Sequence, residues 1–195
     1  LASMMIVTIW LAGCTEQSPS GDTSGTTSGL LSAKDAWEKV RPEVEIWDPG
    51  YKIAWIDHFG NHWSEDAKEQ SWEFYVESAD GATSTTFTYP INNGVSKEAD
   101  TPFGTGRYTF QASDWMVDST QAASIALNAI NDNTVPGFNG GLKAVMYANE
   151  DDIPYWDIDY DSQRKNREID LDLPSHHGDV KINAKTGEII DITGS

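Results

Sequence analysis

The sequence has only one cysteine, Cys14, among its 195 residues. A single thiol cannot form a disulfide within the chain, and the region after Cys14 has no thiolate with which to bind a metal. Disulfide-stapled scaffolds and cysteine-ligated zinc folds are therefore excluded for the folded part of the chain.

Positive charge is also scarce: 13 Lys and Arg stand against 31 Asp and Glu, for a net charge of −18. A polyanion is repelled by phosphates, and no basic patch offsets the repulsion, so nucleic-acid binding is excluded. The acidity fits a solubilised surface, a high-salt habitat, or capture of cations or basic peptides, and the sequence leaves all three open. Rings are plentiful, with 8 Trp, 7 Tyr and 6 Phe, so a packed core is expected.

Recognisable catalytic motifs are missing. Gly104-Thr105-Gly106 is too short to cradle a phosphate, and no nucleophile-elbow motif occurs. We therefore predict a non-enzymatic protein with no catalytic residue and no cofactor.

The four histidines do not form a convincing metal site. His58 and His62 have a spacing that would suit zinc on a helix, but the Gly-Asn pair between them favours a turn. His176 and His177 are adjacent in a loop sequence, where neighbouring side chains diverge. We expect these histidines to be ordinary loop residues.

Long hydrophobic runs are limited to Met4–Ala12, nine residues without charge. This run is shorter than the roughly 20 residues that span a bilayer and has the length of a signal-peptide core. It leads directly into Leu11-Ala12-Gly13-Cys14. The following stretch to Gly29 is almost wholly Ser, Thr, Gly and other small polar residues, which indicates a flexible tether.

Leu11-Ala12-Gly13-Cys14 resembles the lipobox of bacterial and archaeal lipoproteins. The resemblance implies that residues 1–13 are a cleaved signal peptide and that the Cys14 thiol carries lipid. The signal peptide is expected to be truncated, because the chain begins at Leu1 without a Met or a basic segment. Residues 14–29 would then be a lipidated tether, and the rest would lie at the cell surface or on the extracytoplasmic face of the membrane.

Residues 30–94 read as a helix followed by three strands. Ser32 can cap a helix over 33–40, which we expect Pro42 to end. Strands are predicted by alternating apolar residues over 51–57, 72–78 and 83–89. Residues 95–117 read as a connector.

Residues 118–195 repeat the same order. Asp118-Ser119 caps a predicted helix over 120–131, and strands are predicted over 142–148, 155–161, 178–183 and 188–192. A further hairpin arm is expected at 167–173. Trp156 lies 156 − 72 = 84 residues after Trp72, and the two helices are offset by nearly the same amount, which indicates a tandem duplication.

The second unit resembles a PepSY domain. The resemblance rests on Val117–Ala122 opening a helix, on Trp156-Asp157-Ile158 within a strand, and above all on the closing hairpin Val180–Ile190. It is weaker over residues 30–94, and Asn183 stands where the family usually carries Asp. PepSY-like domains are implied to be small, non-catalytic αβ modules found outside cells, which regulate peptidases by binding them.

We therefore expect an α+β fold of two tandem PepSY-like units, each a helix packed on a small antiparallel sheet. The predicted function is a membrane-anchored extracytoplasmic lipoprotein that binds a peptide or protein partner, with basic partners favoured by the charge. Binding would use strand addition at a sheet edge or a groove between the units. A modulated peptidase or another envelope protein is the expected kind of partner, and an enzyme with a site between the units is a third, less favoured class.

The alternative is an acidic, calcium-binding surface protein. Its candidate residues are Asp151, Asp152, Asp157, Asp159 and Asp161. Alternation places the last three on one face of a strand, spread about 7 Å apart, whereas a calcium loop curls its ligands around one point. A solvated strand face is thus the favoured interpretation, and weak, diffuse cation binding is the other.

Overall fold

The computed structural model describes residues 29–58, 63–90, 94–102, 104–133, 135–165, 168–169 and 175–194. The helices in these ranges are α1 (Ala33–Trp47), the short 3-10 helix η1 (Ala112–Asp114) and α2 (Ser119–Asn133). The strands of the first half are β1 (Lys52–His58), β2 (Ser71–Glu77), β3 (Ser84–Pro90) and β4 (Ser96–Lys97). Those of the second half are β5 (Gly141–Ala148), β6 (Pro154–Asp161), β7 (Arg164–Lys165), β8 (Glu168–Ile169), β9 (His177–Asn183) and β10 (Ile189–Ile192).

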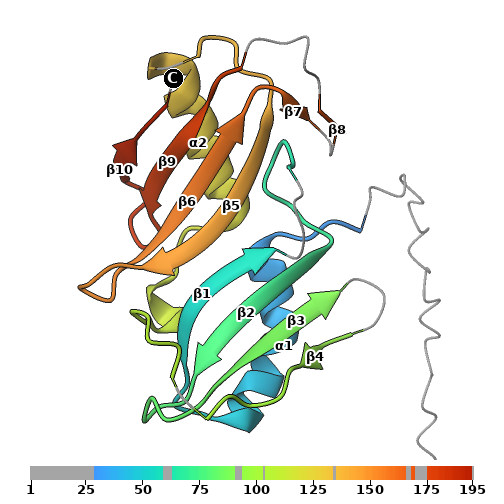
Figure 1. Ribbon diagram of the computed structural model, residues 1–195, viewed down its shortest axis with the longest axis vertical. Coiled ribbons are helices and arrows are strands. Elements are labelled where there is room, and N and C mark those ends of the chain that lie inside the picture. The colour runs from blue at the N-terminus through green and yellow to red at the C-terminus, as the bar shows by residue number, and fades with distance from the viewer. Residues whose placement is uncertain are drawn as a thin grey trace, which may run out of the picture.

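Eight strands form one antiparallel sheet in the order β10-β9-β6-β5-β1-β2-β3-β4. Figure 1 shows α1 and α2 on the same face of this sheet, with α1 behind β1–β3 and α2 behind the second-half strands. The separate pair β7-β8 lies between β6 and β9 in the chain. The predicted α+β class is confirmed.

The two halves meet edge to edge. Each half has a helix followed by four strands of the main sheet, and their first strands, β1 and β5, pair with each other. Trp55 lies opposite Tyr147 and Ile56 opposite Met146 in this pairing. The predicted pair of small sheets is thus a single continuous sheet, whose seam is the β1–β5 contact.

The same tryptophan contact occurs in both halves. Trp72 of β2 donates its indole N–H to the carbonyl of Leu31 at 2.9 Å, just before α1. Trp156 of β6 donates its indole N–H to the carbonyl of Val117 at 2.8 Å, just before α2. Both indoles are fully buried and meet edge to face across the seam, with ring centroids 6.3 Å apart. The two equivalent tryptophans therefore form the centre of one shared core.

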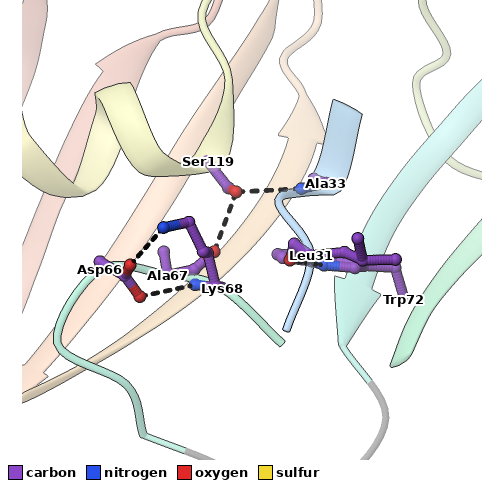
Figure 2. A network of polar contacts seen from close by, with 7 residues as sticks. All are labelled: Leu31, Ala33, Asp66, Ala67, Lys68, Trp72 and Ser119. Atoms are coloured by element: carbon purple, nitrogen blue, oxygen red, sulfur yellow. Dashed lines mark hydrogen bonds and ion pairs between the residues drawn. The ribbon is translucent and has the colours of Figure 1, made fainter. Parts of the chain in front are cut away.

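The starts of the two helices are also connected (Figure 2). Ser119 is fully buried at the first turn of α2; its hydroxyl accepts the N–H of Ala33 at 3.1 Å and donates to the carbonyl of Ala67 at 2.9 Å. Asp118 accepts the backbone N–H of both Ser119 and Lys34. The backbone N–H groups of Ala33 and Lys34, which the start of α1 leaves without an intrahelical partner, are thus satisfied by the second unit.

Pro42 does not end the first helix, contrary to the prediction. The helix runs on to Trp47, with Pro42 inside it on an exposed stretch. Beyond the proline, Val44 is fully buried and Trp47 packs against the core, so the apolar stripe begun by Val40 continues for another turn. Burial of that turn outweighs the one backbone hydrogen bond that proline cannot donate.

The predicted strands begin and end within two residues of the observed ones. The expected hairpin arm is represented by β7 and β8, which start earlier than predicted, at Arg164; residues 167 and 170–173 of that prediction lie outside the described residues. The lipobox, Cys14 and the tether up to residue 28 also lie outside them. Within the described ranges, no helix has the length and apolar character needed to cross a membrane.

Candidate functional site: an aromatic groove on the open sheet face

The sheet face opposite the two helices, here called the open face, carries a row of aromatic side chains. Strand alternation places Trp72, Phe74 and Trp156 against the helices, so their neighbours point the other way. The open-face rings come from four adjacent strands of both units: Tyr155 of β6, Tyr147 of β5, Trp55 of β1 and Tyr75 of β2.

These rings contact one another across the strands. Trp55 stacks on Tyr75 with ring centroids 3.8 Å apart and planes tilted by 19°. On the other side of the seam, Tyr147 and Tyr155 lie 6.1 Å apart. The row therefore continues from one unit into the other at the strand pairing of Trp55 with Tyr147.

Arg107 of the connector lies over this row. Its guanidinium carbon is 4.5 Å from the ring centroid of Trp55 and 5.8 Å from that of Tyr147. Because Tyr75 stacks on Trp55 from the β2 side and Tyr147 lies on the β5 side, the guanidinium occupies the space between the two units' rings. It makes cation–π contacts with one ring from each unit.

The connector is attached to the sheet by a few polar contacts. Thr105 donates its backbone N–H and its hydroxyl to Glu77 at 3.2 and 2.9 Å, and Thr109 donates its N–H to Asp152 at 3.4 Å. At Gly104, a Cβ would lie 2.6 Å from the carbonyl oxygen of Gly81, so only glycine allows this close approach.

A groove of about 580 Å³ lies under the connector. It is open to solvent, and its lining combines small residues, tyrosines and the arginine. The lining residues are Ala54, Gly106, Arg107, Tyr108, Tyr147, Ala148 and Tyr155. A volume of this size accommodates one or two side chains of a partner.

Below the groove the open face is acidic. In the strand register, Asp157 lies opposite Lys181, and Asp159 lies opposite Lys143 on one side and Asp179 on the other. Burial raises the pKa of Asp157 to about 6, with Asp159 and Asp179 adding to the shift while Lys181 opposes it. Burial likewise raises the pKa of Asp159 and of Asp57 on β1, which lies two strands from β6. The patch formed by Asp57, Asp157, Asp159 and Asp179 thus disfavours further negative charge and favours an incoming cation.

Unpaired oxygens add to this preference. Oδ1 of Asp157 and Oδ2 of Asp179 are buried and have no hydrogen-bond partner among the described residues. Buried carboxylate oxygens without a donor raise the free energy of the charged form. A cationic group placed near them would lower it.

The predicted acidic residues do not converge on one point. Asp157 and Asp159 share the open face with Lys143 and Lys181, whereas Asp161 pairs with Arg164 at 3.2 Å. Asp151 and Asp152 lie on the exposed turn between β5 and β6. In the part of the chain that the structure describes, no group of three or more acidic or histidine side chains is arranged to hold a metal ion.

The histidines are likewise dispersed. His58 is 3% exposed and packs edge-on against Trp72, on the helix side of β1. His177 begins β9 and His176 precedes it, while His62 lies outside the described residues. His58 is therefore a core residue, where the sequence had predicted a loop.

The groove residues were not predicted. The abundant rings had been interpreted mostly as core residues, yet Trp55 lies on the open face. A bulge between Ile53 and Trp55 shifts the alternation, so that Ile53 and Ile56 are both fully buried although they lie three residues apart. The odd spacing of these isoleucines was a usable signal for Trp55, whereas nothing in the connector marked Arg107.

The strand β10 at one edge of the sheet is a second candidate surface. Its outer backbone side has no neighbouring strand in the sheet, and Ile189 and Ile190 are 44% and 54% exposed. An edge with exposed apolar residues can accept an added strand.

Comparison with known proteins agrees with this organisation. Residues 117–193 match the PepSY family model, described as "Peptidase propeptide and YPEB domain". The match begins at the carbonyl that accepts the Trp156 indole and extends through β10. A search of curated proteins found no match.

A solved structure has a similar fold over both units. It is the crystal structure of a Clostridium difficile 630 protein classed provisionally as a lipoprotein, with 14% sequence identity and a TM-score of 0.50. The alignment covers 82% of this chain and 93% of that one. Residues 117–193 of this chain are therefore similar to the PepSY family, and 82% of the chain shares the fold of a protein classed provisionally as a lipoprotein.

Proposed function

We propose that this protein is an extracytoplasmic, non-catalytic binding module, anchored by lipid on Cys14, which regulates a peptidase or another envelope protein. The PepSY match supports the regulatory role, since the description of that family refers to peptidase propeptides. The lipobox and the Ser/Gly tether support the anchor.

The observation that carries the proposal is the aromatic groove on the open face. Aromatic rings left on a solvated sheet face, at a junction between two units, are typical of a recognition surface. The groove draws Tyr155 and Tyr147 from the second unit and Ala54 from the first. A partner that binds there would contact both units at once.

The chemistry of the groove favours binding over catalysis. Its walls offer rings, a guanidinium and backbone groups, and the neighbouring titratable side chains are aspartates and lysines that pair across strands. A peptide held there would be positioned by stacking and by charge. The anchor and tether would keep the groove near the membrane surface, where a membrane-bound peptidase is reached at high effective concentration.

The groove assignment can be tested by site-specific crosslinking. A photoreactive amino acid in place of Tyr108, which lines the groove and is 53% exposed, should crosslink a partner in envelope preparations. The same replacement at exposed Ile46 on α1, across the sheet from the groove, is the control and should give no such product. Equal products at both positions would contradict the groove as the binding site.

The regulatory role is tested with the crosslinked partner. If the partner is a peptidase, the chain should inhibit its hydrolysis of a peptide substrate, and the double variant Tyr147→Ser/Tyr155→Ser should inhibit it at least tenfold less well. An isolated peptidase whose rate is unchanged by an excess of the chain would contradict the role.

The anchor requires a separate test. The precursor, expressed in a bacterial host, should appear in the membrane fraction with a diacylglyceryl group on Cys14 by mass spectrometry. The Cys14→Ser variant should be found in the soluble fraction, because it lacks the thiol that is alkylated. A wild-type chain without lipid would contradict this part of the proposal.

Strand addition at β10 is a second mode of binding, favoured by the exposed isoleucines of that edge. Ile190→Lys would place a charge on the edge and should weaken a partner that binds there. A partner of the groove should be unaffected by this change.

A further inference from the structure

Arg107 occupies the groove as a side chain of a partner could. Its guanidinium lies between Trp55 of the first unit and Tyr147 of the second, at 4.5 and 5.8 Å from their ring centroids. The groove is therefore able to hold a guanidinium against two rings, since it already holds one.

The contacts of this guanidinium are weak. Arg107 is an exposed residue, and its guanidinium has no ion pair or hydrogen bond with a described residue; its backbone N–H contacts Thr105. Cation–π contacts at exposed positions are among the weaker interactions in proteins. Another cation could displace this side chain readily.

The connector can release the side chain without unfolding the sheet. Gly106, the residue before Arg107, has φ of +66° and no atom near the position of an added Cβ. The anchoring hydrogen bonds are those of Thr105 and Thr109, on either side of the arginine. A change in the Arg107 rotamer alone empties the space between the rings.

The charge of the open face also favours a cation. Asp57 and Asp157 both interact electrostatically with Tyr147, so negative charge lies near one of the two rings that contact Arg107. Lys143 lies opposite Asp159 and Lys181 opposite Asp157 in the strand register, and each lysine interacts electrostatically with that aspartate. The whole chain carries a net charge of −18, which attracts basic partners over longer distances.

We propose that the groove is a binding site for a guanidinium or ammonium side chain of a basic peptide, and that Arg107 is its intramolecular placeholder. The inference rests on the proposed function, because it names the chemistry of the partner that the groove binds. When the partner arrives, its cationic side chain takes the place of Arg107 between Trp55 and Tyr147, and the arginine swings into solvent.

Stacking of a neutral ring or a sugar is disfavoured by the same geometry. Tyr75 covers the β2 side of Trp55, and the guanidinium covers the β5 side. A neutral ligand would have to displace the arginine without replacing its charge. An acidic partner would bind Arg107 itself and would meet the aspartates beside it.

The test is calorimetric titration of the full chain, carrying Cys14→Ser to prevent lipidation, with the hexapeptide acetyl-(Ala-Arg)3-amide. The controls are the citrulline peptide, which keeps the shape and loses the charge, and the glutamate peptide. Only the arginine peptide should bind. Arg107→Ala should tighten its binding about three- to sixfold, because the competing internal cation is removed.

A ring variant and a spectroscopic readout place the binding at the groove. Tyr147→Leu should weaken binding of the peptide, whereas Tyr147→Phe keeps the ring and should bind as the wild type does. The peptide should shift the indole N–H resonance of Trp55, which is identified by its loss in Trp55→Phe.

The outcomes separate this inference from the proposed function. Unchanged or weaker binding by Arg107→Ala, or equal binding of the citrulline peptide, would overturn the placeholder. If no basic peptide binds but Tyr108 still crosslinks an envelope partner, the inference fails while the proposed function stands. If no basic peptide binds and Tyr108 crosslinks no partner, both the inference and the proposed function fail.

Discussion

At the scale of single residues, Ser119 is the clearest link between the two units. Its buried hydroxyl satisfies the N–H of Ala33 and the carbonyl of Ala67. We predict that Ser119→Ala lowers the free energy of unfolding by about 1–3 kcal/mol, since both groups lose a buried partner. Urea unfolding followed by circular dichroism measures the change.

Ser124→Ala is the matched control, because Ser124 is exposed on the same helix. It should leave stability within about 0.5 kcal/mol of the wild type or slightly above it, as alanine favours the helix. Equal effects at the two serines would mean that the hydroxyl of Ser119 has no structural role.

Asp157 should make stability depend on pH. Its folded-state pKa, about 6, lies above the usual value of 3.8, so the native state disfavours the charged form. This destabilisation is fully present above pH 6 and fades as the pH falls towards 4, where the folded and unfolded states both bind the proton.

Asp157→Asn should therefore stabilise the protein by about 1–2 kcal/mol at pH 7.5 and should leave its stability unchanged at pH 4. The value at pH 7.5 is reduced because solvent screens a half-buried group. Thermal unfolding at the two pH values measures the difference. Asp151→Asn, on the exposed turn, should change neither value. A benefit at pH 4 as large as that at pH 7.5 would contradict the assignment.

Residue-level features were predictable where strand alternation was regular. Asp157, Asp159 and Asp161 follow strict alternation, so their common face could be derived from the sequence. The face on which Trp55 lies was missed, although the spacing of Ile53 and Ile56 signals it, because one bulge in β1 reverses the direction of every side chain after it. The position of Arg107 depends on contacts between distant segments, which local pattern does not encode.

At the scale of elements, the first helix shows how tertiary packing overrides a local breaker. Pro42 lies inside α1, where proline cannot donate to the carbonyl of Glu38. The helix persists because Val44 and Trp47 continue the buried stripe. The local rule for proline predicted that the helix ends there, whereas the apolar residues beyond Pro42 indicated that the helix continues.

Pro42→Ala should stabilise the protein. The restored backbone N–H and the removal of ring strain favour the variant, and the greater freedom of alanine in the unfolded chain offsets part of the gain. We expect a net increase of about 1–2 kcal/mol in the free energy of unfolding, measured in urea. Lys39→Ala, an exposed change in the same helix, should have little effect. A less stable Pro42→Ala variant would show that the proline fixes a bend which the packing needs.

At the scale of the whole molecule, the decisive feature is the seam. The duplicated order of elements was predicted from the sequence, but the pairing of β1 with β5 was not. Both are internal strands of the sheet, and their sequences do not state which strand each will pair with. The seam creates both the continuous core and the groove, so the candidate site could not be predicted before the pairing was known.

The seam also predicts that the two units unfold together. The buried residues of both helices and both halves of the sheet form one cluster, with Trp72 and Trp156 in contact at its centre. Trp156→Leu, in the second unit, should lower stability by about 2–4 kcal/mol through the cavity it leaves. Because the core is shared, the loss should appear equally in the amides of β2 in the first unit and of β6 in the second.

Hydrogen exchange measured by mass spectrometry, at several urea concentrations, follows both strands at once. In the wild type, the most protected amides of β2 and β6 should exchange with the same free energy, and Trp156→Leu should reduce both by the same amount. Ile189→Thr, a change at the exposed edge strand β10, should reduce neither appreciably. If Trp156→Leu reduced the protection of β6 but not that of β2, the two units would fold separately. The groove that they share would then open whenever one unit unfolds.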